Sequence, residues 1–172
     1  MKKLFGIIGN PIKHSLSPVL HKYWFDKYSL DADYSIIDVT NNNLTKIIDK
    51  IKDRSFTGIN VTLPYKQKII NYLDKVVNDA EQTGSVNTVL VDGNKSVIGE
   101  NTDVFGLQAA YLKEIDNNKS QKALVIGAGG VSPSVILSLQ KSGIRNISLT
   151  NRTNEKCIFL KKRFNTINIL PW

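Results

Sequence analysis

The feature that most constrains the fold is a glycine-rich loop between an apolar run and a helical pattern. Residues 123–126 predict a buried strand that runs directly into Gly127-Ala128-Gly129-Gly130. A helical pattern follows over residues 131–142 and ends at Gly143, the residue type expected just past a helix. In such a unit the first glycine permits the tight turn, and the second lets a pyrophosphate approach the backbone. The loop favours dinucleotide binding, and an ordinary strand-to-helix turn is the alternative.

Two positions beyond the first glycines bear on which dinucleotide this loop would bind. The third position of the glycine fingerprint falls on Ser132, so the match is imperfect. After the next predicted strand comes Asn151-Arg152-Thr153, where NAD-binding units carry an acidic residue. An arginine there can pair with a 2′-phosphate, whereas the alternative is an exposed arginine in a polar turn. We therefore predict NADP as the cofactor, bound by Gly127, Ala128, Gly129, Gly130, Asn151, Arg152 and Thr153.

Short β-rich runs alternate with helical periods along most of the chain. Residues 4–8 are apolar and end at Gly9, as is typical of a buried strand. The clearest helical face is formed by four residues, which are Leu44, Ile47, Ile48 and Ile51. This alternation predicts an α/β architecture with mostly parallel sheets. The other strands are expected over residues 34–39, 56–61, 86–91, 96–98, 123–126, 147–150 and 167–170.

Three helix starts are expected beside polar sequence. Ser17 is a good N-cap for the first helix. Thr62 is expected to begin another helix. Asn101 or Thr102 is expected to cap a long helix that runs to about residue 115. These starts place polar residues at the ends of predicted strands.

Composition limits the classes of partner. The net charge is +8, but the basic residues are scattered, and the closest run is Lys161-Lys162-Arg163, so we do not expect nucleic-acid binding. No apolar run approaches the roughly 20 residues of a membrane span. The single cysteine, Cys157, cannot form an internal disulfide, so a cytoplasmic location is expected. We also expect no metal, because no cysteines and histidines have ligand spacing.

Four polar clusters within residues 1–106 are unusual for loops that only connect elements. Three of them fall at a strand-to-helix junction or just before a helix, and ligands of open α/β sheets bind beyond the carboxyl ends of strands. Their hydroxyls, amides, amine and carboxylate suit a small polyhydroxylated acid. The clusters are Ser15-Leu16-Ser17-Pro18, Asn60-Val61-Thr62-Leu63-Pro64-Tyr65-Lys66, Ser85-Val86-Asn87-Thr88 and Asn101-Thr102-Asp103-Val104-Phe105-Gly106.

Together with Gly9-Asn10-Pro11, the glycine loop and Asn151-Arg152-Thr153, these clusters resemble the motifs of the shikimate dehydrogenase family, in the same order. The resemblance covers residue 5 to the end of the chain. It implies the reversible reduction of 3-dehydroshikimate to shikimate with NADPH, in aromatic amino-acid biosynthesis.

The resemblance also implies roles for single residues. Lys66 and Asp103 would be the catalytic pair and would both contact the substrate. Hydride transfer to a ketone generates an alkoxide that must be protonated, so a positioned acid is required. A surface ion pair without catalytic importance is the alternative for these two residues. The other implied substrate contacts are Ser15 and Ser17 to the carboxylate, and Asn60, Thr62 and Asn87 around the ring hydroxyls.

The sequence departs from the family pattern at two places. Ser85 stands where the family usually has alanine, which should be harmless. Val131-Ser132-Pro133 stands where small residues and an arginine are common, which puts the pyrophosphate contacts in doubt.

The polar residues 116–122 predict a boundary in this architecture. Residues 1–103 are expected to form an N-terminal α/β substrate-binding and catalytic domain. Residues 104–172 are expected to add a connecting helix and an incomplete Rossmann-type dinucleotide-binding domain, because six strands make a complete one. We therefore expect a truncated chain, or one that a partner completes, with self-association through residues 123–172, for which a homodimer is one form.

Two further readings stay open from the sequence. A quinate/shikimate relative of the same family can accept NAD, although Arg152 argues against it. The chain could also bind shikimate-like acids without turnover, because part of the family's cofactor domain is absent from it.

Overall fold

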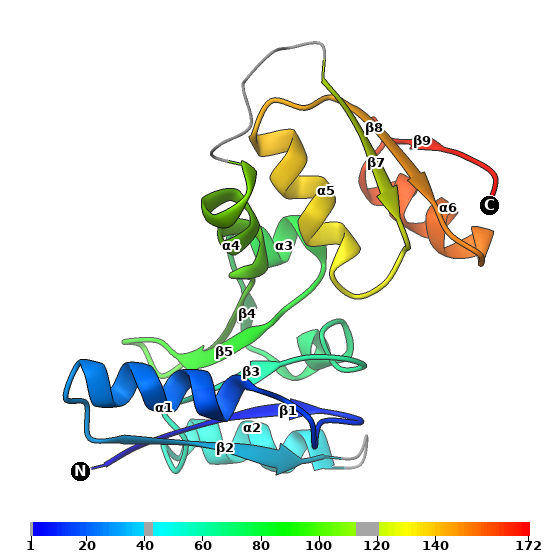
Figure 1. The fold of residues 1–172 in the computed structure, drawn as a ribbon. Helices are drawn as coiled ribbons and strands as arrows, with labels where there is room; N and C mark the ends of the chain where they lie inside the picture. The colour runs from blue at the N-terminus through cyan, green and yellow to red at the C-terminus, as the bar shows by residue number, and fades with distance from the viewer. Residues whose placement is uncertain (1, 40–42, 113–120) are drawn as a thin grey trace.

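Two sheets with their flanking helices make up the protein, for which a computed structural model describes residues 2–39, 43–112 and 121–172 (Figure 1). The first sheet has the strand order β2-β1-β3-β5-β6-β4 and the second has the order β7-β8-β9. The α/β prediction is confirmed. The strands are β1 (Lys3–Gly9), β2 (Ala32–Asp38), β3 (Gly58–Val61), β4 (Lys75–Val76), β5 (Thr88–Val91), β6 (Val97–Glu100), β7 (Lys122–Ile126), β8 (Asn146–Thr150) and β9 (Asn168–Ile169).

The first sheet is mixed. Its strand β1 is parallel to β2 and β3, whereas β5 is antiparallel to both β3 and β6. Strands β5 and β6 form a hairpin, and the Asp92 carboxylate closes its turn by accepting hydrogen bonds from the backbone of Asn94 and Ser96, at 2.8 and 2.9 Å. All pairings in the second sheet are parallel.

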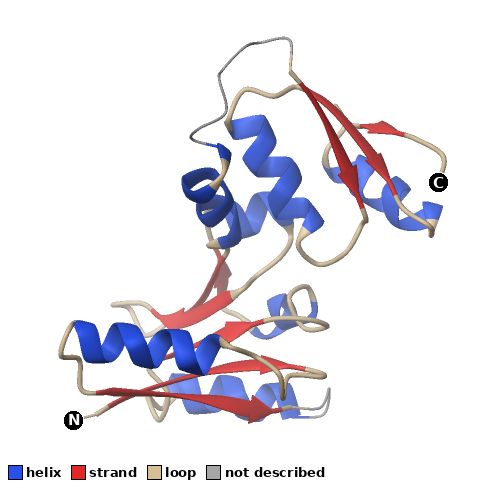
Figure 2. Cartoon of the chain, viewed as in Figure 1, coloured by secondary structure: helices blue, strands red, loops and turns tan. Residues whose placement is uncertain are grey.

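Helices cover both faces of the first sheet (Figure 2). Phe25 of α1 packs against Phe5 of β1, with ring centroids 5.6 Å apart and the rings tilted by 35°. Helix α2 packs on the opposite face, where its buried residues form one core with Ile8. Burial of an aliphatic side chain contributes about 1.5–3 kcal/mol. The four buried residues of α2 therefore stabilise the packing of this helix on the sheet. The helices are α1 (Ser17–Lys27), α2 (Leu44–Lys52), η2 (a 3-10 helix, Lys68–Tyr72), α3 (Asp79–Thr83), α4 (Asp103–Ala110), α5 (Ser132–Lys141) and α6 (Asn154–Arg163).

The second core lies between the second sheet and helices α4, α5 and α6. It contains Ile147 and Leu149 of β8 together with Ile136 of α5. Because side chains alternate along a strand, the neighbours of the buried Val125 in β7 point the other way, and Leu124 is 57% exposed.

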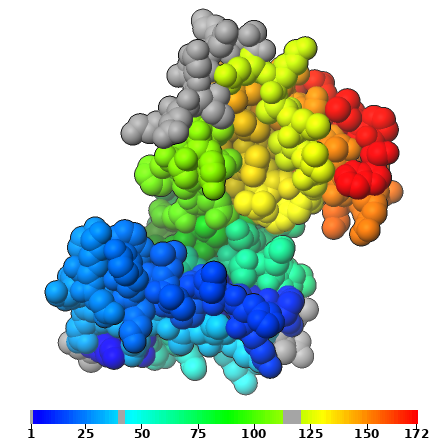
Figure 3. Space-filling view, in the orientation of Figure 1, coloured from blue at the N-terminus to red at the C-terminus, as the bar shows by residue number. Residues whose placement is uncertain are grey.

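Helices α3 and α4 lie between the two sheets, and α5 packs against both of these helices (Figure 1). Lys141 of α5 forms an ion pair with Asp79 of α3. From α6, the guanidinium of Arg163 donates to the carbonyl of Glu81 at 3.0 Å. Figure 3 shows the yellow-to-red segment above the blue and cyan N-terminal segment, joined through the green one.

The expected helix start at Thr62 is wrong. Residues 63–67 form turns and a bend, and the helical residues begin only with η2. Pro64 disfavours the α conformation of Leu63, which prevents a regular first turn. The Tyr65 hydroxyl also donates to the carbonyl of Val39 at 2.8 Å and fixes this segment to the core. Lys66 therefore lies in a turn and not at the start of a helix.

The bounds of two other helices were also predicted. Helix α1 begins with Ser17, one residue earlier than predicted, and the Ser15 hydroxyl accepts its backbone N–H at 3.2 Å. Helix α4 ends at Ala110, and the expected end near residue 115 lies outside the described residues. Most of the predicted boundary at 116–122 falls outside the described residues.

Candidate active site

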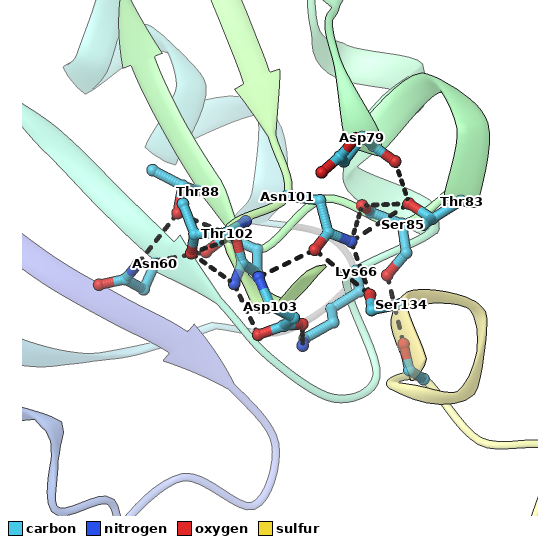
Figure 4. Close-up of polar contacts among 12 residues, drawn as sticks. Asn60, Lys66, Asp79, Thr83, Ser85, Thr88, Asn101, Thr102, Asp103 and Ser134 are labelled. Atoms are coloured by element: carbon cyan, nitrogen blue, oxygen red, sulfur yellow. Dashed lines mark hydrogen bonds and ion pairs between the residues drawn. The ribbon is translucent and has the colours of Figure 1, made fainter. Parts of the chain in front are cut away.

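Lys66 and Asp103 form a partly buried ion pair (Figure 4). Lys66 Nζ lies 2.6 Å from Asp103 Oδ2, and the two side chains are 12% and 26% exposed. The other carboxylate oxygen accepts a hydrogen bond from Asn87 Nδ2 at 2.8 Å. Asp103 begins α4, where the backbone N–H groups and the helix dipole favour a carboxylate. The carboxylate of the pair is thus held by a second side chain, unlike that of a solvated surface ion pair.

The buried amide of Asn101 holds the backbone of Asp103 in place. Asn101 Oδ1 accepts the backbone N–H of Asp103 at 3.0 Å. Its nitrogen donates to the carbonyl of Ser85 at 2.7 Å and to Ser134 Oγ of α5 at 2.9 Å. Thr102 occupies the N-cap position without a side-chain cap, so the polar contact at the helix start comes from Asn101. One buried side chain therefore joins the ion pair to the helix that follows the glycine loop.

Asn60 is held on three sides. Its nitrogen donates to the carbonyl of Asn87 at 3.2 Å and to Thr88 Oγ1 at 3.3 Å. Its oxygen accepts the hydroxyl of Tyr34 at 2.7 Å. Burial raises the pKa of Tyr34 to about 12, while the Ser17 side chain acts in the opposite direction. Tyr34 was missed in the sequence, because a single tyrosine in a β-rich run carries no local signal of function.

Ser15, Ser17 and Thr62 surround a hollow of about 300 Å³, which His14 also lines. Asn60, Asn87, Asp103 and Lys66 are joined to one another by the contacts described above. The structure thus brings the seven predicted residues into two groups, and Tyr34 contacts the second through Asn60. That all seven line a single pocket stays a prediction.

The glycine loop is fixed by side chains. Gly127 has φ of +108°, which favours glycine. Asn151 Oδ1 accepts the backbone N–H of Ala128 at 3.1 Å. Ser132 accepts from the N–H of Gly129 at 2.9 Å and donates to the carbonyl of Gly127 at 2.8 Å. The serine in the third position of the glycine fingerprint therefore bridges two residues of the loop, Gly127 and Gly129.

The loop also approaches the turn that carries Lys66. A Cβ added to Gly130 would lie 2.9 Å from Leu63 Cδ2, the end of an exposed side chain that would have to move. Ser85 Oγ donates to the carbonyl of Gly130 at 3.3 Å. Serine in place of the alanine common in the family thus adds a contact between the two halves of the site.

A cleft of about 380 Å³ separates the turn that carries Lys66 from the glycine loop. Leu63, Pro64 and Gln67 line it on one side, beside Lys66, and Ala128–Gly130 line it on the other, together with residues of α6. Arg152 is exposed at the end of β8, and Thr153 is the N-cap residue of α6. The open loop, the cleft and the exposed guanidinium fit a phosphorylated dinucleotide.

Cys157 does not have the features of a reactive cysteine. Burial raises the pKa of the Cys157 thiol, which is the reverse of an activated cysteine. Among the described residues, no group of three or more His, Cys, Asp or Glu could hold a metal ion. In the same part of the chain, no helix has the length and apolar character needed to cross a membrane.

Comparison with known proteins gives consistent matches. Residues 7–89 match the family "Shikimate dehydrogenase substrate binding domain", and residues 110–171 match "Shikimate / quinate 5-dehydrogenase". A shikimate dehydrogenase (NADP(+)) of Pelagibacter ubique is 45% identical over 172 residues, which is all of this chain and 64% of that protein. One of Caldanaerobacter subterraneus is 41% identical over 154 residues, 90% of this chain and 55% of its own length.

Solved structures are similar to this chain over nearly its whole length. Shikimate dehydrogenase from Aquifex aeolicus is 38% identical with a TM-score of 0.89, over 98% of this chain and 62% of that one. The enzyme from Thermus thermophilus, in complex with NADP(H) and shikimate, is 32% identical with a TM-score of 0.85, over 98% and 63%. This chain therefore spans less than two thirds of the length of these relatives.

Proposed function

Because the chain belongs to the shikimate dehydrogenase family, we propose that it takes part in the reversible, NADP-dependent reduction of 3-dehydroshikimate to shikimate, a step of aromatic amino-acid biosynthesis. The observation that carries this proposal is the Lys66–Asp103 pair, which adjoins the cleft shared with the glycine loop.

Lys66 is the proton donor in this proposal. Reduction of the ketone needs one hydride and one proton, and a bound nicotinamide supplies the hydride. The ammonium of Lys66 gives its proton to the substrate oxygen as that oxygen becomes an alkoxide, and the lysine is left as a neutral amine. Asp103 keeps the ammonium in place, because its carboxylate is itself held by Asn87. In the oxidation direction the neutral amine takes the proton back.

The polar residues around the pair would orient the substrate. Ser15 and Ser17 are close in sequence and line one hollow, as a carboxylate that accepts two hydroxyl hydrogen bonds requires. Asn60, Thr62 and Asn87 would face the ring hydroxyls.

The cofactor-side residues would select NADP. The backbone at Ala128–Gly130 is fixed by Asn151 and Ser132, so it is preorganised for a pyrophosphate. Arg152 is exposed where a 2′-phosphate would lie, and its guanidinium can bind that group through two hydrogen bonds. We further propose that residues 1–103 form the substrate-binding and catalytic part and that residues 104–172 form the cofactor-binding part. A cytoplasmic location also belongs to this proposal.

A second candidate is binding of shikimate without turnover. It is favoured by the second sheet, which has three strands in the described residues, whereas a complete doubly wound dinucleotide sheet has six. The exposed Leu124 and Ile126 of β7 would favour self-association in that case, including a homodimer.

One pair of measurements separates these candidates. The purified chain is mixed with shikimate and NADP and NADPH absorbance is followed, while a thermal-shift titration uses shikimate alone. NADPH formation supports the dehydrogenase, and a thermal shift without NADPH supports binding alone. No NADPH and no shift would overturn both. Quinate in place of shikimate tests the quinate/shikimate alternative, which predicts an equal or larger response.

A further inference from the structure

We propose that Tyr34 is a positioning residue that holds the oxygen of the Asn60 amide in place, so that this oxygen can accept a hydrogen bond from a hydroxyl group of the substrate. The inference rests on the proposed function for its ligand class, a polyhydroxylated acid. It assigns a role to a residue of the edge strand β2 that the motifs do not include.

The hydrogen bonds around Asn60 allow only one orientation of its amide. The carbonyl of Asn87, 3.2 Å from Asn60 Nδ2, can only accept, so the nitrogen must face it. The second amide hydrogen points to Thr88 Oγ1, whose own hydrogen goes to Asn87 Oδ1 at 3.0 Å. Both amide hydrogens are therefore used within the protein. The oxygen takes the Tyr34 hydroxyl at 2.7 Å and keeps one lone pair for a ligand.

Tyr34 is suited to act as a fixed donor. Burial raises its pKa to about 12, so the phenol keeps its proton at neutral pH. The ring of His21 stacks on the Tyr34 ring with centroids 4.1 Å apart and planes at 8°. His21 lies one turn after Ser17 on α1, and burial lowers its pKa, so the stack is neutral near pH 7. The phenol ring is thus held by the helix that also carries Ser17.

This placement lets Tyr34 connect helix α1 with Asn60. Its hydroxyl donates to Asn60 on β3, and its ring stacks on His21 of α1, the helix that also carries Ser17. Loss of the hydroxyl would leave the Asn60 amide held only through its nitrogen, by contacts of 3.2 and 3.3 Å, without the contact of 2.7 Å to its oxygen. The Asn60 oxygen would then be less precisely placed to accept a substrate hydroxyl, which weakens binding.

The test measures shikimate affinity by calorimetry. Tyr34→Phe keeps the ring and its stack with His21 and removes only the hydroxyl. We expect affinity to fall about 2- to 10-fold, the range that corresponds to one neutral hydrogen bond. Tyr28→Phe is the matched control, because Tyr28 is 63% exposed and lies at the end of α1. Its affinity should equal that of the unmodified chain.

A double-mutant cycle separates positioning from a general structural effect. In an Asn60→Ala background, Tyr34→Phe should change shikimate affinity no further. An equal loss in both backgrounds, or no loss in either, overturns the inference and leaves the proposed function standing. No binding by the unmodified chain overturns the proposed function and this inference with it.

A second measurement needs no variant. In nuclear magnetic resonance spectra of the unmodified chain, the two side-chain amide hydrogens of Asn60 should keep their hydrogen-bonded character when shikimate is added. A change that releases either of them would show that the nitrogen turns toward the ligand, and this would overturn the inference.

Discussion

Lys66 Nζ and Asp103 Oδ2 lie 2.6 Å apart, although 37 positions separate the two residues in the chain. The first stands in a turn after β3 and the second at the start of α4, so the fold of the first sheet creates the pair. Neither partner is fully exposed, and the carboxylate has further contacts to Asn87 and, through its backbone, to Asn101. The geometry of the Lys66–Asp103 pair is therefore preorganised before any ligand binds.

Lys66→Ala should separate chemistry from binding. A general acid acts mainly in the transition state, so NADP-dependent turnover should fall about 10²- to 10⁴-fold, with little change in shikimate affinity. Steady-state kinetics and calorimetry measure the two quantities. Lys95→Ala, in the exposed turn of the β5–β6 hairpin, is the control. Unchanged turnover in the Lys66 variant would remove this residue from the mechanism.

Asn101→Ala should destabilise the protein by about 2–3 kcal/mol. The reason is that Ser134, the Ser85 carbonyl and the Asp103 N–H all lose a partner in a buried setting. The free energy of unfolding in urea measures this. Asn94→Ala, in an exposed turn, should stay within about 0.5 kcal/mol of the unmodified chain. Equal stability of both variants would contradict the role of Asn101.

Such a buried amide is also what the sequence could least reveal. Periodic patterns predicted the strands and the buried face of α2, because such patterns depend only on residues within one element. Asn101 contacts Ser134, 33 positions away, and no local pattern encodes that distance. The motif residues were found through the family resemblance, whereas Tyr34 was missed because its role depends on an approach across β1.

One local prediction failed for an identifiable reason. The helix expected from Thr62 was based on a polar start and apolar spacing, but the proline at position 64 and the anchor of Tyr65 produce turns. The contacts of Ser132 could not be predicted from spacing either, because its hydroxyl bridges Gly129 and Gly127. In both places side-chain contacts decide what spacing alone does not.

Arg152→Ala should weaken binding of adenosine 2′,5′-bisphosphate about 10- to 100-fold, as expected for the loss of charge-assisted hydrogen bonds. Affinity for adenosine 5′-monophosphate, which lacks the 2′-phosphate, should not change. Arg145→Ala is the matched control, because Arg145 is exposed just before β8, at the end opposite Arg152. Equal loss for both ligands would contradict a contact to the 2′-phosphate.

Tyr34 should make stability depend on alkaline pH. Its pKa is raised from 10.0 to about 12 in the folded protein, so the folded state holds this proton more tightly than the unfolded state. Its contribution is complete below pH 10 and is lost as pH rises toward 12. The free energy of unfolding should therefore fall less steeply in Tyr34→Phe than in the unmodified chain over this window. Identical slopes would contradict the buried phenol.

The central claim is that polar residues from separate elements form one substrate site around Lys66. A titration of the isotope-labelled chain with shikimate, followed by nuclear magnetic resonance, tests it most directly. The account predicts that the signals that change belong to Ser15, Ser17, Asn60, Thr62, Lys66, Asn87 and Asp103 and their neighbours, while β8 and β9 stay unchanged. No change at these residues, or changes confined to the second sheet, would contradict it.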